Sequence, residues 1–200
     1  VPLVFDEVLA ELDLTGAPAP PSSPEAVSVG SLSKVAWGGL RVGWIRADAA
    51  LVARLARFKA VHDLGSGVLD QLTAVELLAD FDAVRAVRVA QLRRQHDHLC
   101  ALLREELPEW EFTPARGGQT LWVRLPGVDA ASYAQVALRH GVAVLPGGSL
   151  DPTGGSADRL RLPFTADPAV ITAAVDGLAA AWHAYAAEST RRPLVPSMSV

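Results

Sequence analysis

The sequence predicts an α/β lobe followed by a smaller α+β lobe. Two observations lead to this prediction. Short β-prone runs alternate with helical patterns over the first part of the chain, and a second set of short strands follows a long helical pattern around residues 82–107. We expect this long helix to connect the two lobes. Half of the 200 residues are apolar, which is enough to build a substantial core.

The first lobe is predicted from three apolar runs and two helical segments. The expected strands cover residues 1–5, 26–30 and 40–45. A stretch rich in proline and serine over residues 16–24 predicts an exposed loop, because proline cannot donate to a sheet ladder. From Asp48 onward the apolar residues recur at helical spacing, and Gly65–Gly67 separates two helical segments.

The second lobe is predicted from four further β-prone runs and two further helices. The expected strands cover residues 110–112, 119–125, 141–145 and 160–164, and the expected helices cover residues 130–140 and 168–187. Pro163 in the last run implies a sheet edge or a strand end. The residues after 187 carry two prolines and little pattern, so we expect an extension there.

Composition and charge exclude several classes of protein. A formal net charge of -4 and a pI of about 5.7 argue against DNA binding by this chain alone and against an anionic membrane surface as partner. Cys100 is the single cysteine and no His/Cys cluster has metal-ligand spacing, so an internal disulfide and a structural zinc site are excluded. Every apolar stretch is interrupted well before the ~20 residues of a membrane span. We expect a cytoplasmic protein, with its five tryptophans in the core.

Lys34 is the first candidate for chemistry, because it follows a β-prone run and lies among hydroxyls and glycines. Ser31 precedes it by three residues and Arg41 follows it by seven, which supplies a hydroxyl and a planar guanidinium for a phosphate. Gly38 and Gly39 permit close backbone approach. A lysine beside a phosphate pocket suggests pyridoxal phosphate, whose aldehyde forms a Schiff base with an amine. The alternative is an ordinary surface lysine.

Asp6 is a candidate for the carboxylate that pyridoxal phosphate needs beside its pyridine nitrogen. Such a carboxylate keeps the nitrogen protonated, which makes the ring an electron sink. Asp6 lies at the C-terminal end of an expected parallel strand, where ligands bind in α/β sheets. The alternative for Asp6 is a helix N-cap or a turn residue.

The two segments Val27-Ser-Val-Gly-Ser-Leu-Ser-Lys34 and Gly39-Leu-Arg-Val-Gly-Trp44 resemble the lysine signature of fold-type I pyridoxal-phosphate enzymes, the class I and II aminotransferases. The resemblance extends, in family order, to residues 4–6, 114–122, 141–147 and 160–164. Residues 31–44 and 118–126 are most similar to the MocR branch of the GntR transcriptional regulators. Those proteins fuse an N-terminal winged-helix DNA-binding domain to an aminotransferase-like domain.

This resemblance implies a division of the chain. Residues 1–80 form the C-terminal part of a fold-type I large domain with a mostly parallel sheet, residues 81–187 form the connecting helix and the small domain, and residues 188–200 form a tail. The first half of the family fold belongs upstream of Val1. Family sites form at a homodimer interface, so the resemblance also implies a homodimer.

The resemblance further implies which residues bind the cofactor. Lys34 forms the internal aldimine with pyridoxal phosphate, and Asp6 is the partner of the pyridine nitrogen. Ser31 and Arg41 bind the phosphate. Ser33 supports the turn that carries them.

Arg161 matches the family arginine that binds the α-carboxylate of the substrate, an amine or amino acid. From its own sequence context, Arg161 is equally an arginine at a strand end that pairs with a nearby acid.

Two positions depart from the family pattern. Leu9 stands where many members have a tyrosine that hydrogen-bonds the phenolic oxygen of the cofactor, and Leu150 stands where an aromatic residue is common.

Three functions stay open at this point. The preferred one is a pyridoxal-phosphate-binding effector and dimerisation domain of a MocR-type regulator, with DNA contact only through a winged-helix domain outside this chain. The second is an active aminotransferase, in which Lys34 moves a proton between the substrate α-carbon and C4′ of the cofactor. The third is a degenerate domain that binds no cofactor. Leu9 favours the first over the second, and the retained Lys34, Asp6, Arg41 and Arg161 argue against the third.

Overall fold

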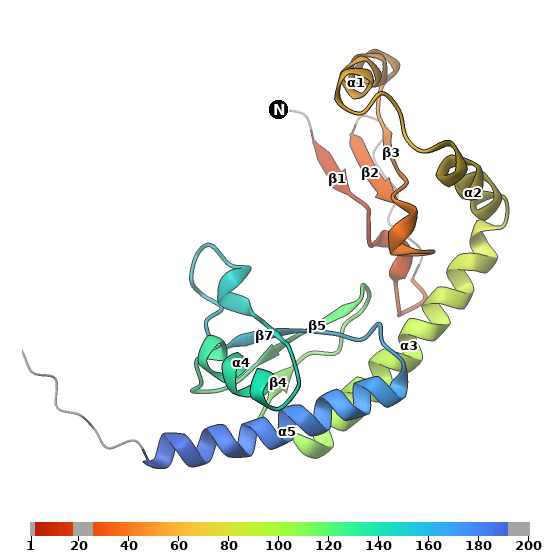
Figure 1. Ribbon diagram of the computed structural model, residues 1–200. Helices are drawn as coiled ribbons and strands as arrows, with labels where there is room; N and C mark the ends of the chain where they lie inside the picture. Colours follow the sequence, from red (N-terminus) through yellow and green to blue (C-terminus); the bar gives the residue numbers. More distant parts are fainter. Residues whose placement is uncertain (1–2, 18–25, 192–200) are drawn as a thin grey trace, which may run out of the picture. The chain divides into compact units, whose positions relative to one another are not determined.

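The computed structural model describes residues 3–17 and 26–191, which divide into two compact units. Unit 1 comprises the residues up to Arg93 together with Arg116–Gly118. Unit 2 comprises Arg94–Ala115 and the residues from Gln119 onward. Helix α3 (Phe81–Glu106) contributes its first half to unit 1 and its second half to unit 2 (Figure 1).

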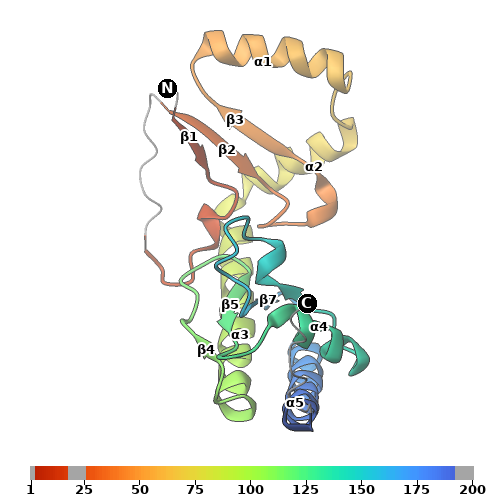
Figure 2. The same cartoon turned by 90° about the vertical axis from the view of Figure 1, so that its left-hand side faces the viewer.

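Unit 1 contains a three-stranded sheet in the order β1-β2-β3, whose strands lie side by side in Figures 1 and 2. The strands are β1 (Val4–Asp6), β2 (Val27–Ser31) and β3 (Gly43–Arg46). The pair β1–β2 is parallel as predicted, whereas β3 is antiparallel to β2. A parallel β3 would need a crossover of about a dozen residues or more, usually a helix. The connection over residues 32–42 holds only a turn and the short helix η2 (Gly38–Leu40).

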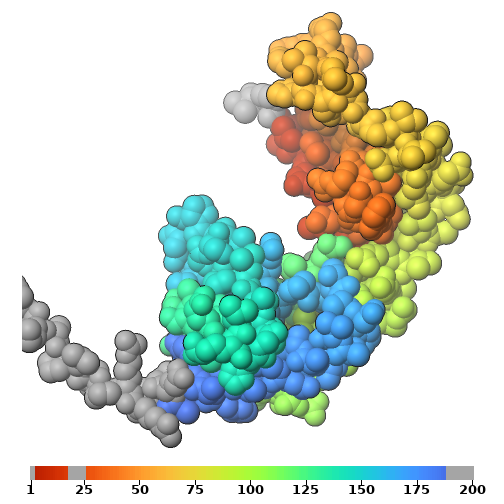
Figure 3. Space-filling model, viewed as in Figure 1, coloured from red at the N-terminus to blue at the C-terminus, as the bar shows by residue number. Residues whose placement is uncertain are grey.

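The helices of unit 1 bury little of their surface. The predicted break at Gly65–Gly67 separates α1 (Ala49–His62) from α2 (Val68–Ala79), and a further break at Asp80 precedes α3. Among their residues, α1 buries none and α2 buries only Ala74. Figure 3 shows both helices, coloured orange to yellow, at the surface of unit 1. One small core cluster, to which α2 contributes, consists of Leu32, Leu40 and Ala74, with Val42, Leu77 and Phe81 packed against it.

Unit 2 contains a four-stranded antiparallel sheet in the order β4-β5-β7-β6. Its strands are β4 (Glu111–Phe112), β5 (Thr120–Arg124), β6 (Leu145–Pro146) and β7 (Arg159–Pro163). Pro163 is the last residue of β7, which confirms the strand end that was one of the two predicted places for this proline. The predicted strand over residues 141–145 is reduced to β6. The backbone N–H groups of Gly141 and Val142 instead donate to carbonyls of Leu138 and Ala137, at the end of the preceding helix.

Helices α4 (Ala130–Arg139) and α5 (Pro168–Arg191) pack against one another in unit 2. The inward residues of β5 and β7 alternate with exposed ones, so Leu121, Val123, Leu160 and Leu162 are buried. Helix α5 continues beyond the predicted end at residue 187. Residues 192–200 of the predicted tail and residues 18–24 of the predicted loop lie outside the described residues.

Candidate active site

Asp6 and Ser31 are the last residues of two neighbouring parallel strands. Their strands therefore end at the same edge of the sheet, where α/β proteins bind ligands. Asp6 is opposite Val29, which is two residues before Ser31. Because side chains alternate between the two faces of a strand, Asp6, Val29 and Ser31 share one face. The structure thus brings a carboxylate and a hydroxyl to one edge and one face of the sheet.

Asp6 is exposed, and its Oδ1 accepts a hydrogen bond from the backbone N–H of Val8 at 3.0 Å. This contact is of the kind that the turn interpretation of Asp6 expects. A hydrogen bond to one carboxylate oxygen is also compatible with binding a cation through the other, since an ionised carboxylate has about four acceptor sites. The contact therefore orients Asp6 and leaves acceptor sites of its carboxylate available.

The loop that carries Lys34 is tied down at its start. The carbonyl oxygen of Val42 accepts from Leu32 N at 3.1 Å and from Ser31 Oγ at 3.4 Å. Ser31 Oγ in turn accepts from the backbone N–H of Ser33 at 3.1 Å. Leu32 is fully buried whereas Lys34 is exposed. Lys34 is thus an exposed side chain on an anchored turn.

Arg41 has an unusual backbone conformation at the other end of this loop. Its φ of 54° and ψ of 27° are left-handed, which costs a non-glycine residue about 1–2 kcal/mol. Such strained residues cluster at functional sites. The conformation reverses the chain between η2 and β3, so that Val42 can accept from Ser31 and Leu32.

Gly39 and Gly30 allow two tryptophans to lie against the backbone near the site. A Cβ at Gly39 would lie 2.3 Å from the ring of Trp37, and a Cβ at Gly30 would lie 2.3 Å from the ring of Trp44. The expectation that the tryptophans are core residues is wrong for these two, with exposed fractions of 65% for Trp37 and 40% for Trp44, and also for Trp122 of β5, which is 37% exposed. The sequence indicated the exposure of Trp37 and Trp44 through nearby glycines, because a glycine has no side chain and leaves space for a ring to lie on the backbone.

The donors in this loop fit the phosphate of pyridoxal phosphate. Between Ser31 and Arg41 the chain supplies a hydroxyl, an amine and a guanidinium, and this stretch contains no acid. A phosphate takes charge-assisted hydrogen bonds from such groups. The carboxylate of Asp6, at the neighbouring strand end, fits the protonated pyridine nitrogen. The residues present therefore fit both charged parts of the cofactor.

Arg161 belongs to unit 2, whereas the other five candidate residues belong to unit 1. It is exposed on β7, opposite Trp122 of β5 and Leu145 of β6. Within residues 3–17 and 26–191, no carboxylate forms an ion pair with Arg161.

The acids near this face of unit 2 are held by other arginines. Arg124 contacts Asp158 at 2.7 Å and Glu111 at 2.9 Å. The hydrogen bond from Arg124 holds the pKa of Asp158 below its ordinary value. The alternative pairing that the sequence left open for Arg161 is therefore not found in the described part of the chain.

The site lacks an aromatic residue at the two positions where the family pattern favours one. Leu9 precedes the short helix η1 (Ala10–Leu12), and its Cδ1 lies 3.8 Å from the position that a Cβ at Gly118 would take. Leu150 is exposed at the end of η3 (Gly147–Ser149). Neither side chain can donate a hydrogen bond to a cofactor oxygen.

An α/β unit with an anchored lysine turn and an antiparallel α+β unit together define a fold-type I pyridoxal-phosphate class of domain. Residues 3–178 match the family Aminotransferase class I and II, and the chain belongs to this family. The resemblance and the fold class inferred from the sequence are thereby confirmed. In the described part of the sheet, the parallel character is limited to the β1–β2 pair.

Three similar proteins illustrate this relationship. The 2-aminoadipate transaminase of Thermus thermophilus is 35% identical over 144 residues, which is 70% of this chain and 36% of that protein. The uncharacterized HTH-type transcriptional regulator YdfD of Bacillus subtilis is 26% identical over 175 residues, which is 82% of this chain and 36% of the regulator. The crystal structure of LysN, the alpha-aminoadipate aminotransferase of Thermus thermophilus complexed with N-(5'-phosphopyridoxyl)-L-leucine, has a TM-score of 0.86 and 29% identity.

The match to LysN covers 94% of this chain and 51% of the LysN chain. The chain therefore spans about a third of the two curated relatives and about half of LysN. No helix in the described ranges is both long and apolar enough to cross a membrane.

Proposed function

We propose that this chain is a pyridoxal-phosphate-binding, aminotransferase-like effector and dimerisation domain of a MocR/GntR-type transcriptional regulator. The observation that carries the proposal is the anchored loop from Ser31 to Arg41, rich in donors and free of acids, beside Asp6. The similarity to the HTH-type regulator YdfD supports the regulatory part. DNA contact would come from a winged-helix domain outside these 200 residues.

The proposal assigns residues 1–80 to the C-terminal part of the large domain, residues 81–187 to the connecting helix and small domain, and residues 188–200 to a tail. Homodimer formation belongs to the same proposal, because sites of this family form between two copies. Static light scattering of the purified chain tests it directly. A mass of two chains supports the proposal, and a monomer at all concentrations contradicts it.

Each candidate residue has a role in this proposal. Pyridoxal phosphate supplies, when bound, an aldehyde that condenses with amines and a ring that withdraws electrons. Lys34 supplies the amine, and the Asp6 carboxylate accepts from the protonated pyridine nitrogen. Ser31 Oγ and the Arg41 guanidinium donate to the phosphate, while the Ser33 N–H holds Ser31 in place.

In the second unit, Arg161 is the proposed donor to the carboxylate of an incoming amino acid. Its guanidinium has no acidic partner among the described residues. An arginine of this kind binds a carboxylate through two parallel hydrogen bonds. The proposal thus assigns Arg161 to holding the substrate carboxylate.

The proposal is tested by trapping the cofactor on the chain. The chain is titrated with pyridoxal phosphate, reduced with borohydride and digested for peptide mass mapping. Lys34 and Lys59 are its only lysines, so the map distinguishes two peptides. Lys59, on α1, donates a hydrogen bond to Asp63 at 2.5 Å. We expect the adduct on Lys34. Equal labelling of both lysines, or no adduct, would contradict a specific cofactor site.

Replacing Arg41 by glycine is expected to separate stability from binding. Glycine adopts the left-handed conformation without strain, so the free energy of unfolding should stay unchanged or rise by up to about 1 kcal/mol. Loss of the guanidinium should weaken pyridoxal-phosphate binding by about tenfold or more. Urea unfolding and cofactor titration measure the two effects.

Arg41→Ala is the matched control for this prediction, because it removes the guanidinium and keeps the strained backbone. Arg41→Ala should bind pyridoxal phosphate more weakly, and its free energy of unfolding should not rise. A glycine variant that binds the cofactor as tightly as the unmodified chain would show that Arg41 does not hold the phosphate.

An active aminotransferase is the second candidate function, favoured by the 35% identity to the Thermus thermophilus 2-aminoadipate transaminase. In that case Lys34 moves the proton between the substrate α-carbon and C4′ of the cofactor, and Arg161 holds the carboxylate. Incubation with 2-aminoadipate and a 2-oxo acid, followed by chromatography of the amino acids formed, separates the two functions. Sustained turnover supports the enzyme. Cofactor binding without turnover supports the regulatory domain, for which Leu9 in place of a tyrosine is the sequence argument.

The coding frame upstream of Val1 provides an independent test. A basic winged-helix sequence in that frame is expected for the regulator. An upstream sequence that continues an aminotransferase fold without a DNA-binding domain would favour the enzyme instead.

A further inference from the structure

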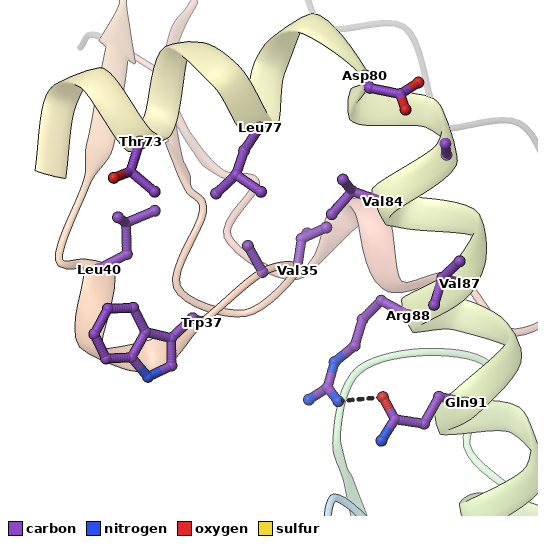
Figure 4. A pocket seen from close by; sticks show the side chains of 12 residues that line it. Val35, Trp37, Leu40, Thr73, Leu77, Asp80, Val84, Val87, Arg88 and Gln91 are labelled. Atoms are coloured by element: carbon purple, nitrogen blue, oxygen red, sulfur yellow. Dashed lines mark hydrogen bonds between the residues drawn. The ribbon is translucent and has the colours of Figure 1, made fainter.

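A groove of about 660 Å³ lies in unit 1 beside the Lys34 loop, and the site described above does not use it. Its walls come from the segment after Lys34, from α2 and from the first half of α3. We call it the Trp37 groove; its main lining residues are Val35, Trp37, Leu40, Leu77, Val84 and Arg88. Figure 4 shows Val35, Leu40, Leu77 and Val84 pointing toward one another inside it. The groove is therefore largely apolar.

Arg88 is the cation of this groove, and it lacks an acidic partner among the described residues. Its Nη1 donates to Gln91 Oε1 at 3.0 Å, while its Nε is buried without a hydrogen-bond partner in that part of the chain. Burial lowers the pKa of Arg88. The guanidinium nevertheless stays charged at any ordinary pH. Asp80 also lines the groove, but its carboxylate points away from Arg88 in Figure 4.

A partly buried charge without a partner is unfavourable, because it loses hydration and gains no opposite charge. A ligand carboxylate would supply that charge, since a planar guanidinium binds a carboxylate through two parallel hydrogen bonds. The remainder of such a ligand would lie against apolar side chains, including the Trp37 ring, which is 65% exposed. The volume is within the range of about 300–1,000 Å³ that is typical of small-molecule sites.

We propose that the Trp37 groove binds an amphiphilic carboxylate, an organic acid whose apolar body packs on Trp37, Leu77 and Val84 and whose carboxylate pairs with Arg88. The segment Val35–Leu40, which forms one wall, connects Lys34 to Arg41. A ligand in the groove would therefore hold the loop that carries the candidate cofactor residues. Binding itself does not depend on pyridoxal phosphate and is tested without it.

Isothermal titration calorimetry with octanoate tests the proposal on the cofactor-free chain. We expect one octanoate per chain, and we expect 1-octanol, which has the same apolar body without the charge, to bind at least about tenfold more weakly. Arg88→Gln should weaken octanoate binding by a similar factor. Arg94→Gln removes the same charge from an exposed position on the same helix and should leave the affinity unchanged.

A second variant tests the groove independently of the charge. Ala83 is exposed and lines the groove, so Ala83→Phe fills it from a position where a larger side chain does not disturb the core. We expect loss of octanoate binding with an unchanged thermal unfolding midpoint. Equal octanoate affinity in the unmodified chain and Arg88→Gln, or equal affinity for octanoate and 1-octanol, would overturn the proposal. Borohydride trapping on Lys34 tests the cofactor site, and octanoate titration tests the groove. The two experiments therefore distinguish failure of one proposal from failure of the other.

Discussion

Replacing Lys34 by alanine is expected to abolish the borohydride-trapped adduct of pyridoxal phosphate. Only an amine condenses with the cofactor aldehyde to give a reducible product, and Lys59 is the single other lysine of the chain. Lys34 is exposed, so its loss should change the free energy of unfolding by no more than about 0.5 kcal/mol. Mass spectrometry of the reduced protein measures the adduct, and urea unfolding measures the stability.

Two further variants make this result specific. Lys59→Ala removes the other lysine amine, which is exposed and hydrogen-bonded to Asp63, and should leave the adduct at its original level. Lys34→Arg retains a positive charge beside the phosphate donors but cannot form the reducible bond. We expect it to keep part of the non-covalent affinity and none of the adduct. An adduct that persists in Lys34→Ala and disappears in Lys59→Ala would reverse the assignment.

Replacing Tyr133 by alanine is expected to destabilise unit 2 by about 3–5 kcal/mol, the usual cost of deleting a large buried aromatic side chain. Tyr133 is fully buried and its Oη donates to the carbonyl oxygen of Leu178 at 2.8 Å. Its ring centroid lies 5.5 Å from Trp110 and 5.7 Å from Trp182, in edge-to-face geometry. The same burial raises the pKa of Tyr133. One side chain thus joins α4, α5 and the segment that precedes β4.

The loss is measured by urea unfolding followed through tryptophan fluorescence, because two tryptophans contact Tyr133. Tyr133→Phe removes only the hydroxyl and should cost about 1 kcal/mol. Leu138→Ala, on the same helix but 57% exposed, is the matched control and should cost much less. If Tyr133→Ala and Leu138→Ala lowered the unfolding free energy equally, the aromatic cluster would not be the core of this unit.

Local patterns in the sequence were sufficient for most of the elements and for the candidate residues. Helical spacing predicted α4 and α5, and the glycines near residue 66 predicted the break between α1 and α2. The spacing of Ser31, Lys34 and Arg41 was enough to identify the loop. These features depend on residues close together in the chain, which is why a sequence pattern reveals them.

Pairing and exposure depended on residues that are distant in the chain. The antiparallel direction of β3 follows from a connection too short for a crossover, and the central place of β7 follows from its pairing with β5 and β6. The left-handed backbone of Arg41 arises where that connection closes onto β2. No pattern around Arg88 indicated that it would face an apolar groove.

The sequence by itself thus determined the family and the order of the elements and supplied the candidate residues, because these depend on local motifs and periodicity. Only the tertiary structure decided which of those residues share an edge of the sheet, which tryptophans are exposed and which arginines lack an acidic partner among the described residues. Those properties arise when the chain closes on itself, since burial and charge compensation are set by neighbours in space.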